Sequence, residues 1–173
     1  IMNNIIQFPT TLTLTTTNNP QKKRLIHQTF NRAYSGPVDT EAASHCINNP
    51  IFTYCIGIID KMEVGYLVTR LHLQSAIKPK CHSFKYCELA VVKEKYRSNG
   101  ALKKMLKMAI IEHGIKGIEL TKVRAEEYRN YYASLGFTQW INLKSGLVIV
   151  ANPSVLKNTN ATQKAPVTMP LAA

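Results

Sequence analysis

The stretch at residues 89–106, LAVVKEKYRSNGALKKML, joins an apolar strand pattern to an amphipathic helix through a short basic segment. The apolar run LAVV is followed by charged residues, then by RSNG at positions 97–100, and a helical pattern starts at once. A helix that begins beyond the end of a strand points unpaired backbone N–H groups, and the positive end of its dipole, at whatever lies there. The stretch therefore predicts either an anion-binding site or a well-capped surface helix, and these residues alone do not separate the two.

The residue types at this junction suit a phosphate group. Gly100 allows the backbone to approach a ligand closely, and Arg97 can offer a charged fork to phosphate oxygens. Ser98 and Asn99 can cap the helix. Two lysines follow within the next turn, where a second phosphate could be reached.

Length and composition indicate one ordinary globular domain. The chain has 173 residues, of which 45% are hydrophobic and 18% charged. No apolar run approaches the roughly 20 residues that a membrane-spanning helix needs, and the N-terminal residues lack the pattern of a secretory signal. We therefore expect a single domain over residues 11–151, a loose tail over 152–173, no membrane partner and a cytoplasmic location.

Positive charge is concentrated around the same stretch. The formal net charge is +12, and residues 78–107 hold nine Lys or Arg residues against two Glu residues. Such a concentration suggests an anionic partner, which could be a phosphorylated cofactor, a nucleic acid or a membrane surface. Composition alone would favour a solvated surface. Nucleic-acid binding would need aromatic residues between the charges, and only Phe84, Tyr86 and Tyr96 are available. A nucleic-acid-binding domain is therefore the lesser alternative.

The four cysteines, at positions 46, 55, 81 and 87, indicate reduced thiols rather than a disulfide framework. They have no paired spacing, and those at 55 and 87 lie in strand-like sequence, where buried thiols are common. Four potential metal ligands are close in sequence but lack the Cys-x-x-Cys spacing typical of zinc sites: His72, Cys81, His82 and Cys87. We expect no metal.

Periodicity and turn residues predict a mixed sheet with helices on both faces. The expected strands are 11–17, 51–59, 63–71, 84–92, 118–123, 137–141 and 146–151, and the expected helices are 20–35, 39–48, 98–113 and 126–135. The order is β-α-α-β-β-β-α-β-α-β-β, of the α/β (α+β) class. The unit from strand 84–92 through its helix to strand 118–123 should be parallel, and the short hairpins elsewhere predict antiparallel neighbours.

Two motifs resemble those of the GCN5-related N-acetyltransferase (GNAT) superfamily. Residues 92–101, VKEKYRSNGA, resemble its acetyl-coenzyme A loop, in which Tyr-Arg or Tyr-Gln precedes x-x-Gly-x-Gly/Ala. Residues 132–137, YASLGF, resemble its second signature, Tyr-x-x-x-Gly-Phe. The order of elements from Leu12 to Ala151 is also similar. Leu102 stands where the family has a small residue, and we expect it to face the sheet as the first residue of the apolar helix stripe.

The resemblance implies a fold, an activity and a cosubstrate. The chain would have a GNAT-like central mixed, mostly antiparallel, twisted sheet of six to seven strands. It would transfer an acetyl group from acetyl-coenzyme A to a primary amine of a small molecule or protein, by direct attack in a ternary complex. The pantetheine arm would lie where strands 84–92 and 118–123 separate, along the backbone of Ala90, Val91 and Val92. An N–H group near Val91 or Val92 would polarise the thioester carbonyl.

The family's other site residues carry over by position. The diphosphate would bind the loop and first helical turn: Arg97, Ser98, Asn99, Gly100, Ala101 and Leu102. Tyr132 matches the tyrosine that protonates the departing thiolate, although it could simply pack with its helical neighbours. Glu88 is the first candidate for the base, Glu119 the second, and water serves in many relatives.

Several questions stay open at the level of sequence. The acceptor amine is not defined, and relatives allow a homodimer. Leu102 and the unsettled base keep a second hypothesis, a regulatory module that binds acyl-coenzyme A without transferring the acyl group.

Overall fold

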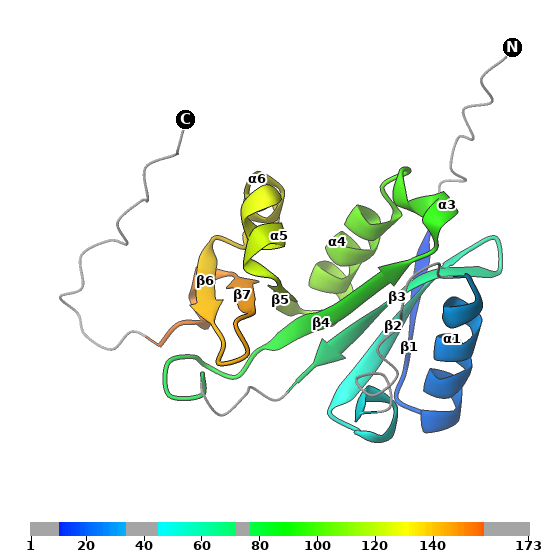
Figure 1. Cartoon of the computed structure of the whole chain (residues 1–173), viewed down its shortest axis with the longest axis horizontal. Coiled ribbons are helices and arrows are strands. Elements are labelled where there is room, and N and C mark those ends of the chain that lie inside the picture. The colour runs from blue at the N-terminus through cyan, green and yellow to red at the C-terminus, as the bar shows by residue number, and fades with distance from the viewer. Residues whose placement is uncertain (1–10, 34–44, 72–76, 158–173) are drawn as a thin grey trace, which may run out of the picture.

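A computed structural model describes residues 11–33, 45–71 and 77–157, and Figure 1 shows their arrangement. The strands in this part of the chain are β1 (Thr13–Thr17), β2 (Phe52–Ile59), β3 (Met62–Arg70), β4 (Lys85–Val92), β5 (Ile115–Leu120), β6 (Gln139–Asn142) and β7 (Val148–Ala151). The helices are α1 (Pro20–Ala33), α3 (Glu94–Arg97), α4 (Ala101–His113), α5 (Lys122–Glu127) and α6 (Arg129–Ser134), with a 3₁₀ turn, η1, at Pro153–Val155. The expected helix over 39–48 lies mostly outside the described residues, and 45–48 form one helical turn.

The described strands form one seven-stranded sheet in the order β1-β2-β3-β4-β5-β7-β6. Neighbouring strands are antiparallel except β4 and β5, which are parallel and connected through α4. The predicted mixed, mostly antiparallel sheet with a single parallel unit is therefore confirmed. The helix α3 is an addition, because the sequence predicted only a polar loop between β4 and α4.

Helices cover both faces of the sheet (Figure 1). On one face, which we call the α4 face, Met105, Leu106 and Ala109 are buried in a cluster with Leu67 of β3 and Cys87 of β4. On the opposite face, the α1 face, α1 packs its apolar side chains on β2 and β3. A second cluster on the α1 face joins β4 and β7 to residues near 77–84 and to η1. The middle of the sheet therefore separates one cluster on the α4 face from two on the α1 face.

Two glycines allow α4 to approach the sheet closely. Gly57 of β2 and Gly65 of β3 are partners in the strand register. A Cβ atom added to Gly57 would lie 2.8 Å from Sδ of Met105, and one added to Gly65 would lie 3.2 Å from the same atom. The Met105 side chain therefore occupies the space that two missing side chains leave, which is a common reason for glycine inside a strand.

The helix α1 begins as predicted, and its buried face also includes two polar residues. Asn19 Oδ1 accepts two hydrogen bonds from backbone N–H groups of the first turn, and Pro20 is the first helical residue. The apolar Leu25 is 60% exposed, whereas Lys23 and His27 are buried. Both buried residues have hydrogen-bond partners on neighbouring segments, so burial leaves neither polar group unsatisfied.

Two strand boundaries differ from the prediction for local reasons. Asp60 and Lys61 both have positive φ, 49° and 63°, so a two-residue turn connects β2 to β3 and β3 starts at Met62. Gly114 ends α4 with a φ of 66°, and β5 starts directly afterwards. The sequence predicts that strand three residues later, from 118, because the glycines at 114 and 117 bracket the end of the preceding helix. Gly117 instead lies in β5, where an added Cβ would meet β7 atoms at 3.1 Å.

The expected helix over 126–135 is two short helices, and it starts earlier. The Thr121 hydroxyl oxygen accepts a hydrogen bond from the Arg124 N–H, which caps α5 and ends β5 at Leu120. Val123, predicted as the end of a strand, is therefore helical and 76% exposed. Tyr128 separates α5 from α6 with a φ of −108°.

Residues 152–157, which the sequence assigns to the loose tail, pack on the domain. Val155 is buried and its carbonyl accepts a hydrogen bond from the His82 N–H, and Leu156 forms a β-bridge with Cys81. The rest of the expected tail lies outside the described residues. No helix in residues 11–33, 45–71 or 77–157 has the length and apolar character to span a membrane.

Candidate functional site

The strands β4 and β5 pair over only part of their length. Their register partners are Lys85 with Ile115 and Cys87 with Ile118, although β4 continues to Val92. The two strands therefore part after Cys87, and a gap in the backbone pairing opens toward their C-terminal ends. In Figure 1, α3 and the start of α4 lie beyond the arrowhead of β4, at the open end of this gap.

The direction of the β4 amides shows which residues face the gap. The N–H of Lys93 donates to the Val64 carbonyl of β3 at 2.9 Å. Alternate residues of a strand turn N–H and C=O to the same side, so Val91 also faces β3. In agreement, a Cβ added to Gly65 would lie 2.6 Å from the Val91 carbonyl oxygen. Ala90 and Val92, rather than Val91, therefore turn their backbone polar groups toward the gap.

The Arg97 side chain joins the loop after β4 to the end of that strand. Its Nε donates a hydrogen bond of 2.9 Å to the Val92 carbonyl, the last of β4. The sequence expected Ser98 or Asn99 to cap the next helix, but α4 has no side-chain cap. The Asn99 side chain instead donates to the Lys95 carbonyl at 3.4 Å. The cap prediction is therefore wrong, and the first N–H groups of α4 are left for water or a ligand.

Gly100 is the residue that lets α4 start at this point. Its φ is 74°, a left-handed conformation that glycine adopts without strain, and a Cβ added there would meet no atom within 4 Å. Its carbonyl accepts the hydrogen bond from Lys104 N–H, at 3.1 Å. The space in front of the helix is therefore open to a group that approaches the backbone.

The two residues after Gly100 turn inward. Ala101 is buried, and Leu102 is partly buried against the α4-face cluster. The expectation that Leu102 begins the apolar stripe is confirmed. Its side chain points to the core and does not fill the space in front of the helix.

Tyr132 approaches the gap from the α4 face. It is 5% exposed and belongs to the same apolar cluster as Cys87, the last β4 residue paired with β5. Burial raises the pKa of Tyr132, and the nearby Cys87 thiol adds to the shift. The hydroxyl is therefore protonated at neutral pH and able to donate a proton or a hydrogen bond. Packing and proton donation are compatible for this residue.

Glu88 stands at a bulge of β4. Thr69 of β3 pairs with Cys87 and Val68 pairs with Leu89, which leaves Glu88 as the extra residue. A bulge of this kind turns two consecutive side chains toward one face and disturbs the regular ladder. Leu89, beside it, is 41% exposed although it lies in the middle strand of the sheet.

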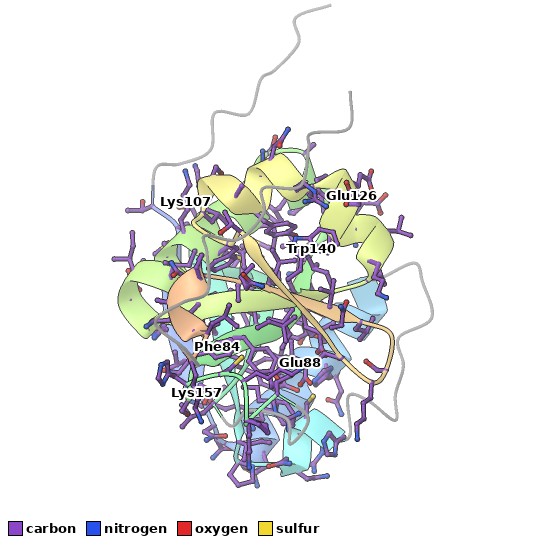
Figure 2. The ribbon with its side chains drawn as sticks, turned by 90° about the vertical axis from the view of Figure 1, so that its left-hand side faces the viewer. Phe84, Glu88, Lys107, Glu126, Trp140 and Lys157 are labelled. Carbon is purple, nitrogen blue, oxygen red and sulfur yellow. The ribbon has the colours of Figure 1, made fainter. Side chains whose placement is uncertain are left out.

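An arginine on the neighbouring strand holds Glu88. Arg70 Nη1 lies 3.5 Å from Glu88 Oε1, and each side chain is about one-fifth exposed. The Arg70 guanidinium lies 5.5 Å from the ring centre of Phe52, which belongs to the α1-face cluster. The Glu88 carboxylate is therefore directed to the α1 face. Figure 2 shows the position of Glu88 near the middle of the molecule, with Trp140 closer to α5 and α6.

Glu119 lies on the same face, across the gap. Its neighbours Ile118 and Leu120 pack on the α4-face cluster, so Glu119 turns to the α1 face. In the register with β7 it is opposite Ile149, a member of the second α1-face cluster. Both carboxylates that the sequence singled out thus flank the gap on the face opposite Tyr132.

Two neighbours of the site were not assigned a function from sequence. Arg70 gave no signal, because its contact with Glu88 depends on the bulge and on the register of β3. The sequence assigns Tyr131 no role beyond packing within its helix, and its position beside Lys103 depends on how α6 lies against α4.

Nucleic-acid binding and a metal site would each need residues that the structure buries or places apart. Phe84 and Tyr86 are buried, so two of the three rings that could stack on nucleic-acid bases are unavailable. Cys81 and Cys87 belong to different clusters on opposite faces. Among the described residues, no group of three or more His, Cys, Asp or Glu side chains could hold a metal ion.

All four thiols are free, and Cys55 and Cys87 are buried as expected.

Comparison with known proteins gives matches in structure and not in sequence. The sequence matches no protein-family model and no curated protein. The structure is similar to the ribosomal-protein-S18-alanine N-acetyltransferase from Escherichia coli, with 15% identity, a TM-score of 0.55 and coverage of 87% of this chain and 98% of that one.

Two further structures give the same result. An acetyltransferase from Thermus thermophilus has 13% identity and a TM-score of 0.53, with 80% and 94% of the two chains covered. The protein NAA60 from Arabidopsis thaliana, in complex with a bisubstrate analogue, has 14% identity and a TM-score of 0.52, with 86% and 100% covered. The chain therefore has the GNAT fold.

Proposed function

We propose that this chain, which has the GNAT fold, is an N-acetyltransferase that moves the acetyl group of acetyl-coenzyme A to a primary amine. The single observation that carries the proposal is the parting of β4 and β5 after Cys87, with an uncapped helix start at its open end. The fold alone does not establish activity, because one fold can serve several functions. The residues at the gap are therefore what supports the activity.

The open end of the gap suits the diphosphate of the cosubstrate. Uncapped N–H groups at the start of α4 and the positive end of its dipole attract anions. Gly100 leaves the approach free, and Lys103 adds a positive charge in the first turn. Arg97 is engaged with the Val92 carbonyl through Nε, so we assign it first to holding the loop in shape.

The gap itself suits the extended pantetheine arm. Ala90 and Val92 turn their backbone polar groups toward it, in the way that a strand offers hydrogen bonds to an added strand. An N–H of this segment that faces the thioester carbonyl would stabilise the negative charge that develops on its oxygen. We assign this role to Ala90 or Val92, since the Val91 amide faces β3.

The transfer step requires two proton movements, one on each face of the sheet. The amine nitrogen attacks the carbonyl carbon, the carbon–sulfur bond breaks, and the sulfur leaves as a thiolate. Tyr132, protonated and on the α4 face, donates a proton to this thiolate. Glu88, on the α1 face, accepts the proton that the attacking amine loses. The acceptor would then approach from the α1 face, where Leu89 is exposed.

The test is turnover of acetyl-coenzyme A with a panel of amines, comparing the wild type with Tyr132→Phe. The proposal expects thiol release that depends on an amine, and a fall of about 10²-fold or more in kcat for the variant. The matched control is Tyr128→Phe, since Tyr128 is 42% exposed and lies one helical turn away.

The same experiment tests the non-catalytic module. Such a module would bind coenzyme A but release no thiol with any amine, and Tyr132→Phe would change nothing. Turnover that is unaffected by Tyr132→Phe would contradict the role of Tyr132 and leave the transferase assignment standing.

A further inference from the structure

The Tyr131 side chain presents a polar group that the protein itself does not satisfy. Its hydroxyl oxygen is buried, and among the described residues it has no hydrogen-bond partner. A buried hydroxyl without a partner loses its hydrogen bonds to water and gains nothing in return, which is unfavourable for folding. Such groups are uncommon in native structures, and each one requires an explanation.

The surroundings of Tyr131 place it along the route expected for the pantetheine arm. The Lys103 ammonium, in the first turn of α4, lies 4.9 Å from the centre of the Tyr131 ring. The rings of Tyr131 and Tyr132 are 5.1 Å apart between centres, with an interplanar angle of 53°. Tyr131 thus contacts both the residue assigned to the diphosphate end and the residue assigned to the thiolate end.

The hydroxyl is suited to donate rather than to lose its proton. Burial raises the pKa of Tyr131 to about 12, and the neighbouring Tyr132 contributes to the shift. A neutral phenol is a good hydrogen-bond donor to a carbonyl oxygen. The pantetheine arm contains two amide groups between its diphosphate and its sulfur, and each carries a carbonyl oxygen.

We infer that Tyr131 is a cofactor-binding residue, whose hydroxyl donates a hydrogen bond to an amide carbonyl of the pantetheine arm. The inference rests on the proposed function, because it takes coenzyme A as the ligand. It adds a side-chain contact on the α6 side of the arm to the backbone contacts on the β4 side. The unsatisfied hydroxyl of the free protein becomes satisfied when the arm binds.

The test compares two ligands, coenzyme A and its nucleotide half, adenosine 3′-phosphate 5′-diphosphate, which lacks the arm. Binding of each is measured by calorimetry to the wild type, Tyr131→Phe, Lys103→Met and the control Tyr128→Phe. We expect Tyr131→Phe to weaken coenzyme A about fivefold to tenfold and to leave the nucleotide half unchanged. Lys103→Met should weaken both ligands, since both carry the diphosphate.

A second measurement separates binding from structural support. In the free protein, Tyr131→Phe should leave the melting temperature unchanged or raise it, because it removes a buried hydroxyl that has no partner. A residue with a purely structural hydroxyl contact would behave in the opposite way, with a lower melting temperature.

The outcomes are distinguishable. Equal affinity of the wild type and Tyr131→Phe for coenzyme A would overturn the inference and leave the proposed function intact. Equal weakening of both ligands would also overturn it, because the arm would then be irrelevant. A wild type that binds neither ligand would reject the proposed function, and the inference with it.

Discussion

Glu88 of β4 and Glu119 of β5 each directly follow the last residue that pairs these two strands with each other, and both turn to the α1 face. Cys87 and Ile118 form the final register pair between the two strands, so the carboxylates stand on either side of the point where the gap begins. Tyr132 lies near Cys87 on the α4 face. The proposed acid and the two candidate bases thus lie on opposite faces of the sheet, on either side of the proposed path of the thioester.

The first prediction separates the two carboxylates. Glu88→Gln should lower kcat about 10²-fold, because the attacking amine loses its proton acceptor, and the remaining rate should rise with pH as more amine becomes unprotonated. Glu119→Gln should have a smaller effect. Steady-state kinetics from pH 6 to pH 10 test this, with Glu127→Gln on the exposed side of α5 as the control. The reverse ranking would move the base to Glu119.

The second prediction concerns the glycines under α4. A Cβ at Gly65 would lie 2.6 Å from the Val91 carbonyl oxygen, a backbone atom held in the sheet. At Gly57 the atoms that a Cβ would meet all belong to the flexible Met105 side chain. Gly65→Ala should therefore lower the free energy of unfolding by about 3 kcal/mol, and Gly57→Ala by about 1 kcal/mol. Urea denaturation gives both values, and a larger cost at Gly57 would contradict the packing described.

The third prediction concerns stability in acid. His27 of α1 lies 2.5 Å from the Tyr54 hydroxyl through Nε2 and 3.4 Å from the Tyr66 hydroxyl through Nδ1. Lys23 lies over the ring of Tyr54 on the same side of the sheet. Burial lowers the pKa of His27 below its ordinary value of 6.5, so the unfolded chain takes up a proton first as the pH falls.

The stability that neutral His27 contributes is thus fully present above pH 6.5. It is lost as the pH falls from there through the pKa of His27 in the folded protein, by at most about 1.4 kcal/mol per pH unit. His27→Gln should flatten the dependence of the unfolding free energy on pH between 7 and 5. The variant should nevertheless be less stable than the wild type at pH 7. His82→Gln, at an exposed position, is the control and should keep the wild-type slope. An unchanged slope in His27→Gln would contradict the prediction.

The parts of the site that the sequence predicts are those encoded by neighbouring residues. The strand–loop–helix junction at 92–101 and the Tyr132–Phe137 motif are local patterns, and Leu102 fits the helix period. All three could be located before the structure was known, because each depends on turn chemistry or on 3.6-residue spacing.

The parts it does not predict depend on how distant strands align. The bulge at Glu88 exists only relative to β3, and the contact with Arg70 follows from it. Thr121 begins a helix within a run that reads as a strand, because a capping side chain overrides the apolar alternation. Lys23 and His27 are polar residues whose burial requires partners from β2 and from the carbonyls of Cys46 and Asn49. The bulge, the Arg70 contact and the burial of Lys23 and His27 leave no signal in a single local window, whereas the Thr121 cap is a local contact within the run that reads as a strand.

The central claim, that the start of α4 binds a diphosphate, is tested most directly by calorimetry of coenzyme A with Gly100→Asp and Gly114→Asp. The two glycines lie at opposite ends of α4, with φ of 74° and 66°, and neither would bring a Cβ within 4 Å of another atom. The backbone strain and the added charge are therefore matched, and only the position differs. We predict that the wild type and Gly114→Asp bind coenzyme A, and that Gly100→Asp binds at least about tenfold more weakly because its carboxylate repels the diphosphate. Equal affinity of the two variants, or no binding by the wild type, would contradict the claim.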